Sequence, residues 1–202
     1  MAVGVVLKYP SLINDILGRG GARIVSTAPA TFGNIMLPDQ SAFRQDYPEW
    51  GAKSLGGTSD TLAGYGCTIT SVANAISNLR EQSVRPDVLN QSLIENSGYT
   101  SRGWLIWSAV SKATQDEVHV KVYNQASHDA IDACMSKGAY PVVKIKLGGV
   151  VPHWVLLVGR DKGEYLARDP LLGDNNDAPI ALSSRSGSIH SLRCVYGAGT
   201  RL

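Results

Sequence analysis

Apolar residues between positions 67 and 79 repeat with the period of an α-helix. Their i, i+3, i+4, i+7 spacing predicts an amphipathic helix, with Cys67 in its first turn. The apolar members of this repeat are Ile69, Val72, Ala73, Ile76 and Leu79. A turn-rich stretch from Gly56 to Gly66 precedes them. The sequence therefore places a cysteine where a tight turn enters a helix.

The remaining pattern predicts further helices followed by a sheet. Helical patterns are expected from Pro86 through Leu93, from Trp104 to Ala113, and after Ser127 through Cys134. Strands are expected at 118–122, 140–147, 154–160, 164–168 and 189–196. Most helices come first and most strands second. This order predicts an α+β domain with a helical layer on one side of an antiparallel sheet.

Residues 1–40 differ from the rest and predict an N-terminal arm attached to one domain over residues 41–202. Pro10, Pro29 and Pro38 interrupt this stretch, and glycines follow one short helical pattern within it. Two interpretations of the arm stay open. It packs against its own domain, or it docks onto a partner or a larger particle.

Composition and charge exclude several classes of protein. Hydrophobic residues make up 44% and charged residues 18% of the 202, as in ordinary globular domains. The formal net charge is +2 without a basic stripe, so we expect no nucleic-acid partner. No apolar run approaches the roughly 18 residues that span a bilayer, so no membrane insertion is expected.

The amino terminus does not resemble a secretory signal. Its apolar stretch Val3–Leu7 has no cationic segment before it. We therefore expect a soluble protein that is cytoplasmic when made. Action outside its cell would require lysis, a dedicated system or a carrier particle such as a virion.

Three cysteines at distant positions cannot all pair, so at least one is a free thiol. Cys134 lies on an apolar helical stripe and Cys194 in the last expected strand, which predicts that both are in the core. Cys67 differs because a helix N-terminus favours the thiolate, the nucleophilic form of cysteine. The alternative is that Cys67 is a small buried hydrophobic residue. The sequence contains no paired Cys-x-x-Cys motif, so we expect no structural metal site.

A histidine and an aspartate form the second half of a candidate catalytic site. His153 lies at the mouth of a strand too apolar to contain a polar side chain by default. A hairpin turn at residues 161–163 returns the chain, and Asp169 then becomes a direct or diagonal neighbour of His153. A carboxylate there would orient the imidazole toward a nucleophile. The alternative is a core histidine and an ordinary Asp-Pro turn.

Five segments together resemble a known family of enzymes. They are Gln45–Gly51, Gly66–Ala73, Pro141–Val143, Pro152–Val155 and Ala167–Pro170. Their order and spacing are similar to those of the cysteine peptidase family that includes the bacteriocin double-glycine leader peptidases, peptidase family 39 of the cysteine class. The resemblance covers about residues 40–175 and suggests a stand-alone member.

The resemblance implies a papain-like fold and a set of catalytic residues. In such a fold Cys67 would lie on the central helix, and His153 and Asp169 on the sheet. The resemblance also implies that the side-chain amide of Gln45 helps to form an oxyanion hole, with Gln40 as the fallback. It implies no cofactor.

The expected function is hydrolysis of peptide bonds. The best-known members are fused to a membrane transporter, for which this chain has no room. Several stand-alone relatives occur in bacterial and phage proteins thought to cut cell-wall peptides. We therefore expect a peptidoglycan stem peptide as substrate and a role in a phage virion or in lysis. Two alternatives stay open: a non-catalytic structural or docking protein, and an acyltransferase that uses the same thioester.

Overall fold

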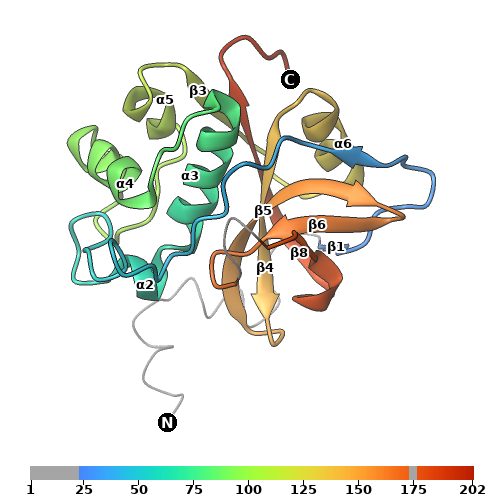
Figure 1. The fold of residues 1–202 in the computed structure, drawn as a ribbon, viewed down its shortest axis with the longest axis horizontal. Helices are drawn as coiled ribbons and strands as arrows, with labels where there is room; N and C mark the ends of the chain where they lie inside the picture. The colour runs from blue at the N-terminus through green and yellow to red at the C-terminus, as the bar shows by residue number, and fades with distance from the viewer. Residues whose placement is uncertain (1–22, 173–176) are drawn as a thin grey trace.

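The computed structural model describes residues 23–172 and 177–202, which form an antiparallel sheet with helices packed against it (Figure 1). Most of the expected N-terminal arm, residues 1–22, lies outside the described residues. The remainder of the arm contributes two short strands to the sheet. Strand β1 (Ile24–Val25) pairs with β8 (Ser188–Gly197), and β2 (Ile35–Met36) pairs with β5 (Val151–Asp161).

The sheet is built around consecutive antiparallel neighbours. Its strands follow the order β1-β8-β4-β5-β6-β7, where β4 is Tyr140–Leu147, β6 is Glu164–Arg168 and β7 is Ile180–Ala181. Strand β3 (Val118–Val122) also pairs with β8. The five strands expected from the sequence are present. They are rich in valine, isoleucine and leucine, which favour the pleated backbone.

Helices cover the sheet from both sides (Figure 1). One group of four lies together: α2 (Leu62–Tyr65), α3 (Cys67–Arg80), α4 (Pro86–Glu95) and α5 (Ala109–Ala113). Helix α6 (His128–Ser136) lies on the other side of the sheet and begins at Ser127, whose hydroxyl accepts a hydrogen bond from the Ala130 N–H. The α+β arrangement is confirmed, and α6 adds a helix outside the expected single layer.

The helix expected over residues 104–113 is shorter than its sequence pattern. Only its last five residues, Ala109–Ala113, form α5. The first part turns back on residues 98–100, since the Ile106 N–H bonds to the Gly98 carbonyl and the Thr100 N–H to the Trp104 carbonyl. The backbone groups that a helix would need are thus already used.

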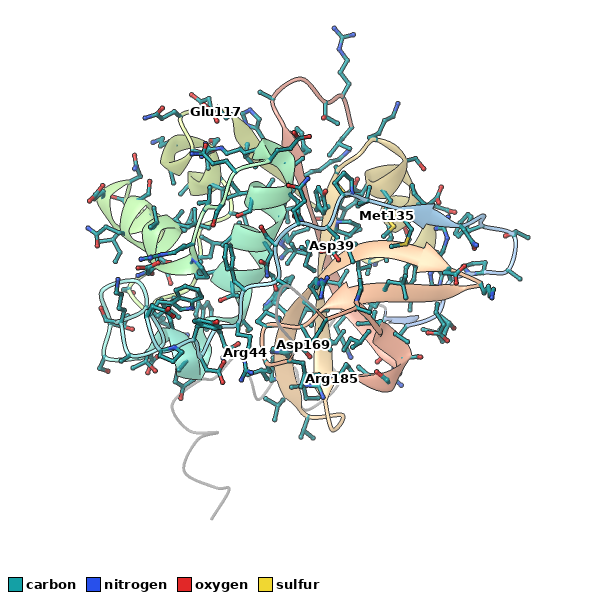
Figure 2. The ribbon with its side chains drawn as sticks, viewed as in Figure 1. Asp39, Arg44, Glu117, Met135, Asp169 and Arg185 are labelled. Atoms are coloured by element: carbon teal, nitrogen blue, oxygen red, sulfur yellow. A yellow bond between two sulfur atoms is a disulfide. The ribbon has the colours of Figure 1, made fainter. Side chains whose placement is uncertain are left out.

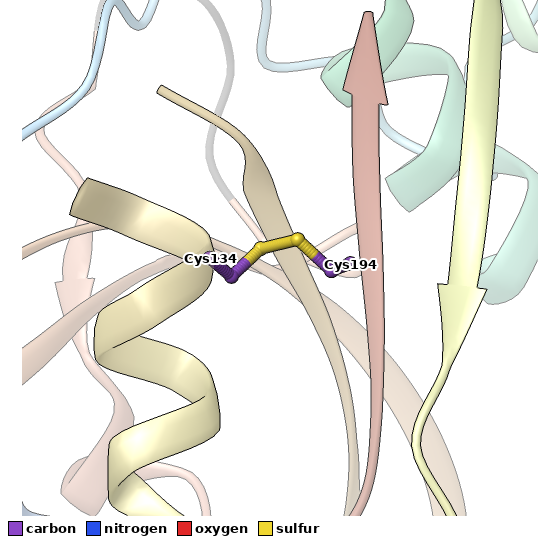
Figure 3. Close-up of a disulfide and its surroundings, with 2 residues drawn as sticks. All are labelled: Cys134 and Cys194. Atoms are coloured by element: carbon purple, nitrogen blue, oxygen red, sulfur yellow. A yellow bond between two sulfur atoms is a disulfide. The ribbon is translucent and has the colours of Figure 1, made fainter. Parts of the chain in front are cut away.

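One disulfide joins helix α6 to the sheet. Cys134 of α6 is bonded to Cys194 of β8, 60 positions later in the sequence (Figure 3). Both residues are completely buried, as the sequence pattern predicts, but their pairing was not part of that prediction. Cys67 is the free cysteine. Within the described residues, no helix is long and apolar enough to cross a membrane.

Candidate functional site

Cys67 is the first residue of α3, directly after the short helix α2. Gly66 makes this junction possible, because a Cβ at that position would overlap the carbonyl oxygen of Leu62. Backbone N–H groups in the first turn of a helix have no partner within the helix and carry its positive dipole end. The Cys67 sulfur is half-buried in this environment.

His153 and Asp169 contact each other directly. His153 lies near the start of β5, and Asp169 is the first residue after β6, the antiparallel neighbour of β5. His153 Nε2 is 2.6 Å from Asp169 Oδ1, and the two side chains are 4% and 0% exposed. This contact occupies Nε2 of the imidazole, which leaves Nδ1 for Cys67.

The charges of these groups favour a thiolate–imidazolium pair. Burial raises the pKa of the Cys67 thiol, but the hydrogen bond and charge of His153 outweigh it and hold that pKa below its usual value. Burial also disfavours the imidazolium, yet Asp169 and Cys67 together raise the pKa of His153 to about 9. Burial alone would raise the pKa of Asp169. The hydrogen bond and charge of His153 are the largest of the effects that instead hold this pKa below its usual value. A thiol, an imidazole and a carboxylate are thus in contact, in the order that a nucleophile, a base and an orienting group would need.

Gln45 lies beside the turn that leads into Cys67. Its side chain is buried, and Nε2 donates a 2.6 Å hydrogen bond to the carbonyl of Ala63, in α2. Its backbone N–H donates to the carbonyl of Pro170, directly after Asp169. Gln40, the fallback, is exposed. The structure therefore brings Gln45 to the site, where the second N–H of its amide is left to bind another acceptor.

A polar stripe on α3 holds the segment that carries Gln45. Ser71, Asn74 and Asn78 follow Cys67 at steps of four, three and four, and so share its face of the helix. Asn78 Oδ1 accepts hydrogen bonds from the backbone N–H groups of residues 40 and 41. Asn74 pairs with both backbone groups of residue 43. We call these three residues the α3 stripe.

Ser71, the first member of the α3 stripe, contacts strand β5 next to His153. Ser71 Oγ donates a 3.2 Å hydrogen bond to the carbonyl of Trp154, the residue after His153. All three residues of the α3 stripe are buried. Their spacing is a readable signal in the sequence, since buried asparagines need partners, but the apolar repeat that predicts α3 does not include it.

Arg185 also contacts the site and was not anticipated. It follows the short 3-10 helix η2 (Leu182–Ser184), and its Nε donates a 2.7 Å hydrogen bond to Asp169 Oδ2 (Figure 2). In the sequence, Arg185 lies 16 positions after Asp169. No motif or periodicity marks this arginine, because its contact with Asp169 arises only in the folded chain.

Comparison with known proteins gives a likeness at the level of the fold. The chain is similar to a solved structure from Bacillus anthracis described as a "putative C39-like peptidase", with a TM-score of 0.54 and 14% sequence identity. The match covers 82% of this chain and 98% of the other. No family model and no curated protein matches the sequence. The chain thus shares its fold with this solved structure.

Proposed function

We propose that the protein is a papain-like cysteine peptidase in which Cys67 is the nucleophile, His153 the general acid and base, and Asp169 the residue that orients His153. The observation that carries this proposal is the contact of the three groups, with the pKa of Cys67 lowered and that of His153 raised. The likeness to a C39-like peptidase fold supports it.

The proposed reaction has two steps. In the first, the Cys67 thiolate attacks the peptide carbonyl, and the imidazolium of His153 gives its proton to the leaving amine as the C–N bond breaks. In the second, His153 takes a proton from water, whose oxygen attacks the thioester. The C–S bond then breaks, which releases the carboxylic acid and restores the Cys67 thiolate and the His153 imidazolium. The second N–H of the Gln45 amide and the Cys67 backbone N–H would stabilise the oxyanion of each step.

We propose bacterial cell-wall peptides as the substrate, cut by a phage or bacterial lytic component. The resemblance to stand-alone relatives supports this choice. The disulfide supports a place of action outside the reducing cytoplasm, because such bonds persist mainly in oxidising surroundings.

The test is mass spectrometry of parallel digests of peptidoglycan stem peptides and of Gly-Gly peptides. The parent should cleave the stem peptides and Cys67→Ala should not. Cleavage of Gly-Gly peptides alone would reject the cell-wall substrate and keep the peptidase. A product joined to an added amine, without hydrolysis, would indicate an acyltransferase. No cleavage and no thioester with any peptide would reject the enzymatic function.

A further inference from the structure

The carboxylate of Asp169 is shared between two cationic partners. Its Oδ1 accepts hydrogen bonds from His153 Nε2 and, at 2.9 Å, from the Leu171 N–H. Its Oδ2 accepts the 2.7 Å hydrogen bond from Arg185 Nε. The Asp169 side chain has no exposed surface, whereas Arg185 is 25% exposed. Each carboxylate oxygen therefore has its own cationic donor.

The backbone of Arg185 is fixed by a buried turn. Its N–H donates a 2.9 Å hydrogen bond to the carbonyl of Leu182, which also accepts a hydrogen bond from the Ser186 N–H. The Leu182 side chain is completely buried. The guanidinium thus extends from an anchored point toward Asp169, and the planar group restricts the rotation of the carboxylate.

We propose that Arg185 is a positioning residue of the catalytic site: it holds Asp169 with Oδ1 toward His153 and limits how strongly Asp169 retains the imidazolium proton. This inference rests on the proposed peptidase function. Arg185 contacts neither the sulfur nor, on this proposal, the substrate. It acts through Asp169 alone.

The charge of Arg185 predicts the direction of its effect. Burial lowers the pKa of His153, and the hydrogen bonds and charges of Asp169 and Cys67 raise it. Lys144 and Lys146 flank Ile145, the residue opposite His153 on β4, so their side chains leave the other face of the sheet. Arg185 contacts Asp169 at Oδ2, the oxygen that His153 does not use. Its removal leaves the full charge of Asp169 to the imidazolium.

The size of this effect follows from Coulomb's law. Two unit charges on opposite sides of a carboxylate are on the order of 6 Å apart, and partial exposure weakens their repulsion. Loss of Arg185 should then raise the pKa of His153 by about one. At the same time Asp169 loses its orientation, which should lower kcat about tenfold without changing KM.

The experiment measures the rate at which iodoacetate alkylates Cys67 as a function of pH. This reagent is an anion, so the imidazolium favours its attack, and the rate falls as His153 loses its proton. The parent should show this fall near pH 9. Arg185→Gln should show it near pH 10, about one unit higher, while Arg185→Lys, which keeps the charge, should stay near the parent.

A matched control is available at the far end of α3. Arg80 is 26% exposed and also pairs with one carboxylate, that of Glu117. Arg80→Gln should leave the alkylation profile unchanged. An unchanged profile in folded Arg185→Gln would overturn the proposal, as would an equal shift in Arg80→Gln.

Two further outcomes remain decisive. If Arg185→Gln does not fold by circular dichroism, kcat of Arg185→Lys decides, because lysine keeps the charge but not the planar group that restricts the Asp169 carboxylate. A lowered kcat at parental KM supports positioning, and a parental kcat overturns it. If the parent cleaves no peptide, the peptidase proposal fails, and the alkylation profile still decides the role of Arg185, because it needs no turnover.

Discussion

Loss of the disulfide should lower the stability of the protein by an amount that follows from its position. The bond closes a loop whose ends are 60 positions apart. In the chain-entropy model, such a cross-link removes about 14 cal/mol/K from the unfolded chain, which is about 4 kcal/mol at 25 °C. For a chain of 202 residues, this corresponds to a fall in Tm of about 10 °C.

The assay is urea unfolding followed by circular dichroism, for the oxidised parent, the reduced parent and Cys134→Ala/Cys194→Ala. The reduced parent keeps both sulfur atoms and so measures the cross-link without a change in packing. The alanine variant should be equally or slightly less stable, because it also loses buried contacts. Cys67→Ala is the control: it keeps the disulfide, so it should unfold like the oxidised parent and lose the same stability on reduction.

Two results would refute this reasoning. The first is identical unfolding of the reduced and oxidised parent, which would mean that the cross-link contributes nothing to the free energy of unfolding. The second is alkylation of all three cysteines in the unfolded, unreduced protein, where only Cys67 should react. Peptidase activity should survive in the alanine variant if it is folded, because the disulfide does not include Cys67.

The remaining predictions concern the catalytic groups. The rate kcat/KM should fall at alkaline pH near 9, because the raised pKa of His153 sets where the imidazolium is lost; a pH–rate profile that stays flat to pH 10 would contradict the ion pair. Gln45→Ala should lower kcat by roughly 10²- to 10³-fold yet leave alkylation of Cys67 nearly unchanged, and full activity would remove Gln45 from the oxyanion hole. His153→Ala should abolish hydrolysis, Asp169→Asn should leave weak activity, and the double variant should equal His153→Ala. Additive losses in that double variant would show that the two residues act separately.

Elements with a clear periodicity could be predicted from the sequence. The apolar repeat after Cys67 gave α3, and alternation gave β3. The amphipathic character expected of α3 is wrong, because the helix is buried on every face from Ile69 to Asn78. Strands β1 and β2 have two residues each, too few to carry a pattern. Each pairs with a short stretch of a longer strand, β1 with residues 188–189 of β8 and β2 with residues 159–160 of β5.

The site could be predicted only where it is local or is brought together by one hairpin. The turn after β5 indicated that Asp169 returns to His153, and the two are in contact. Gln45 entered through the resemblance, since nothing in its own segment marks it. Arg185 and the pairing of Cys134 with Cys194 depend on contacts across the fold, which a single sequence does not encode in a readable pattern.

The α3 stripe has a consequence for which changes of length the protein tolerates. Insertion of one residue between Cys67 and Asn78 would rotate the rest of α3 by about 100°. The hydrogen bonds that Asn74 and Asn78 accept from the backbone N–H groups of residues 40, 41 and 43 would then be lost. Insertions in the exposed segment 46–49 break none of these bonds. Natural variation in length should therefore accumulate in that segment, whereas the distance from Cys67 to Asn78 along the chain should stay constant.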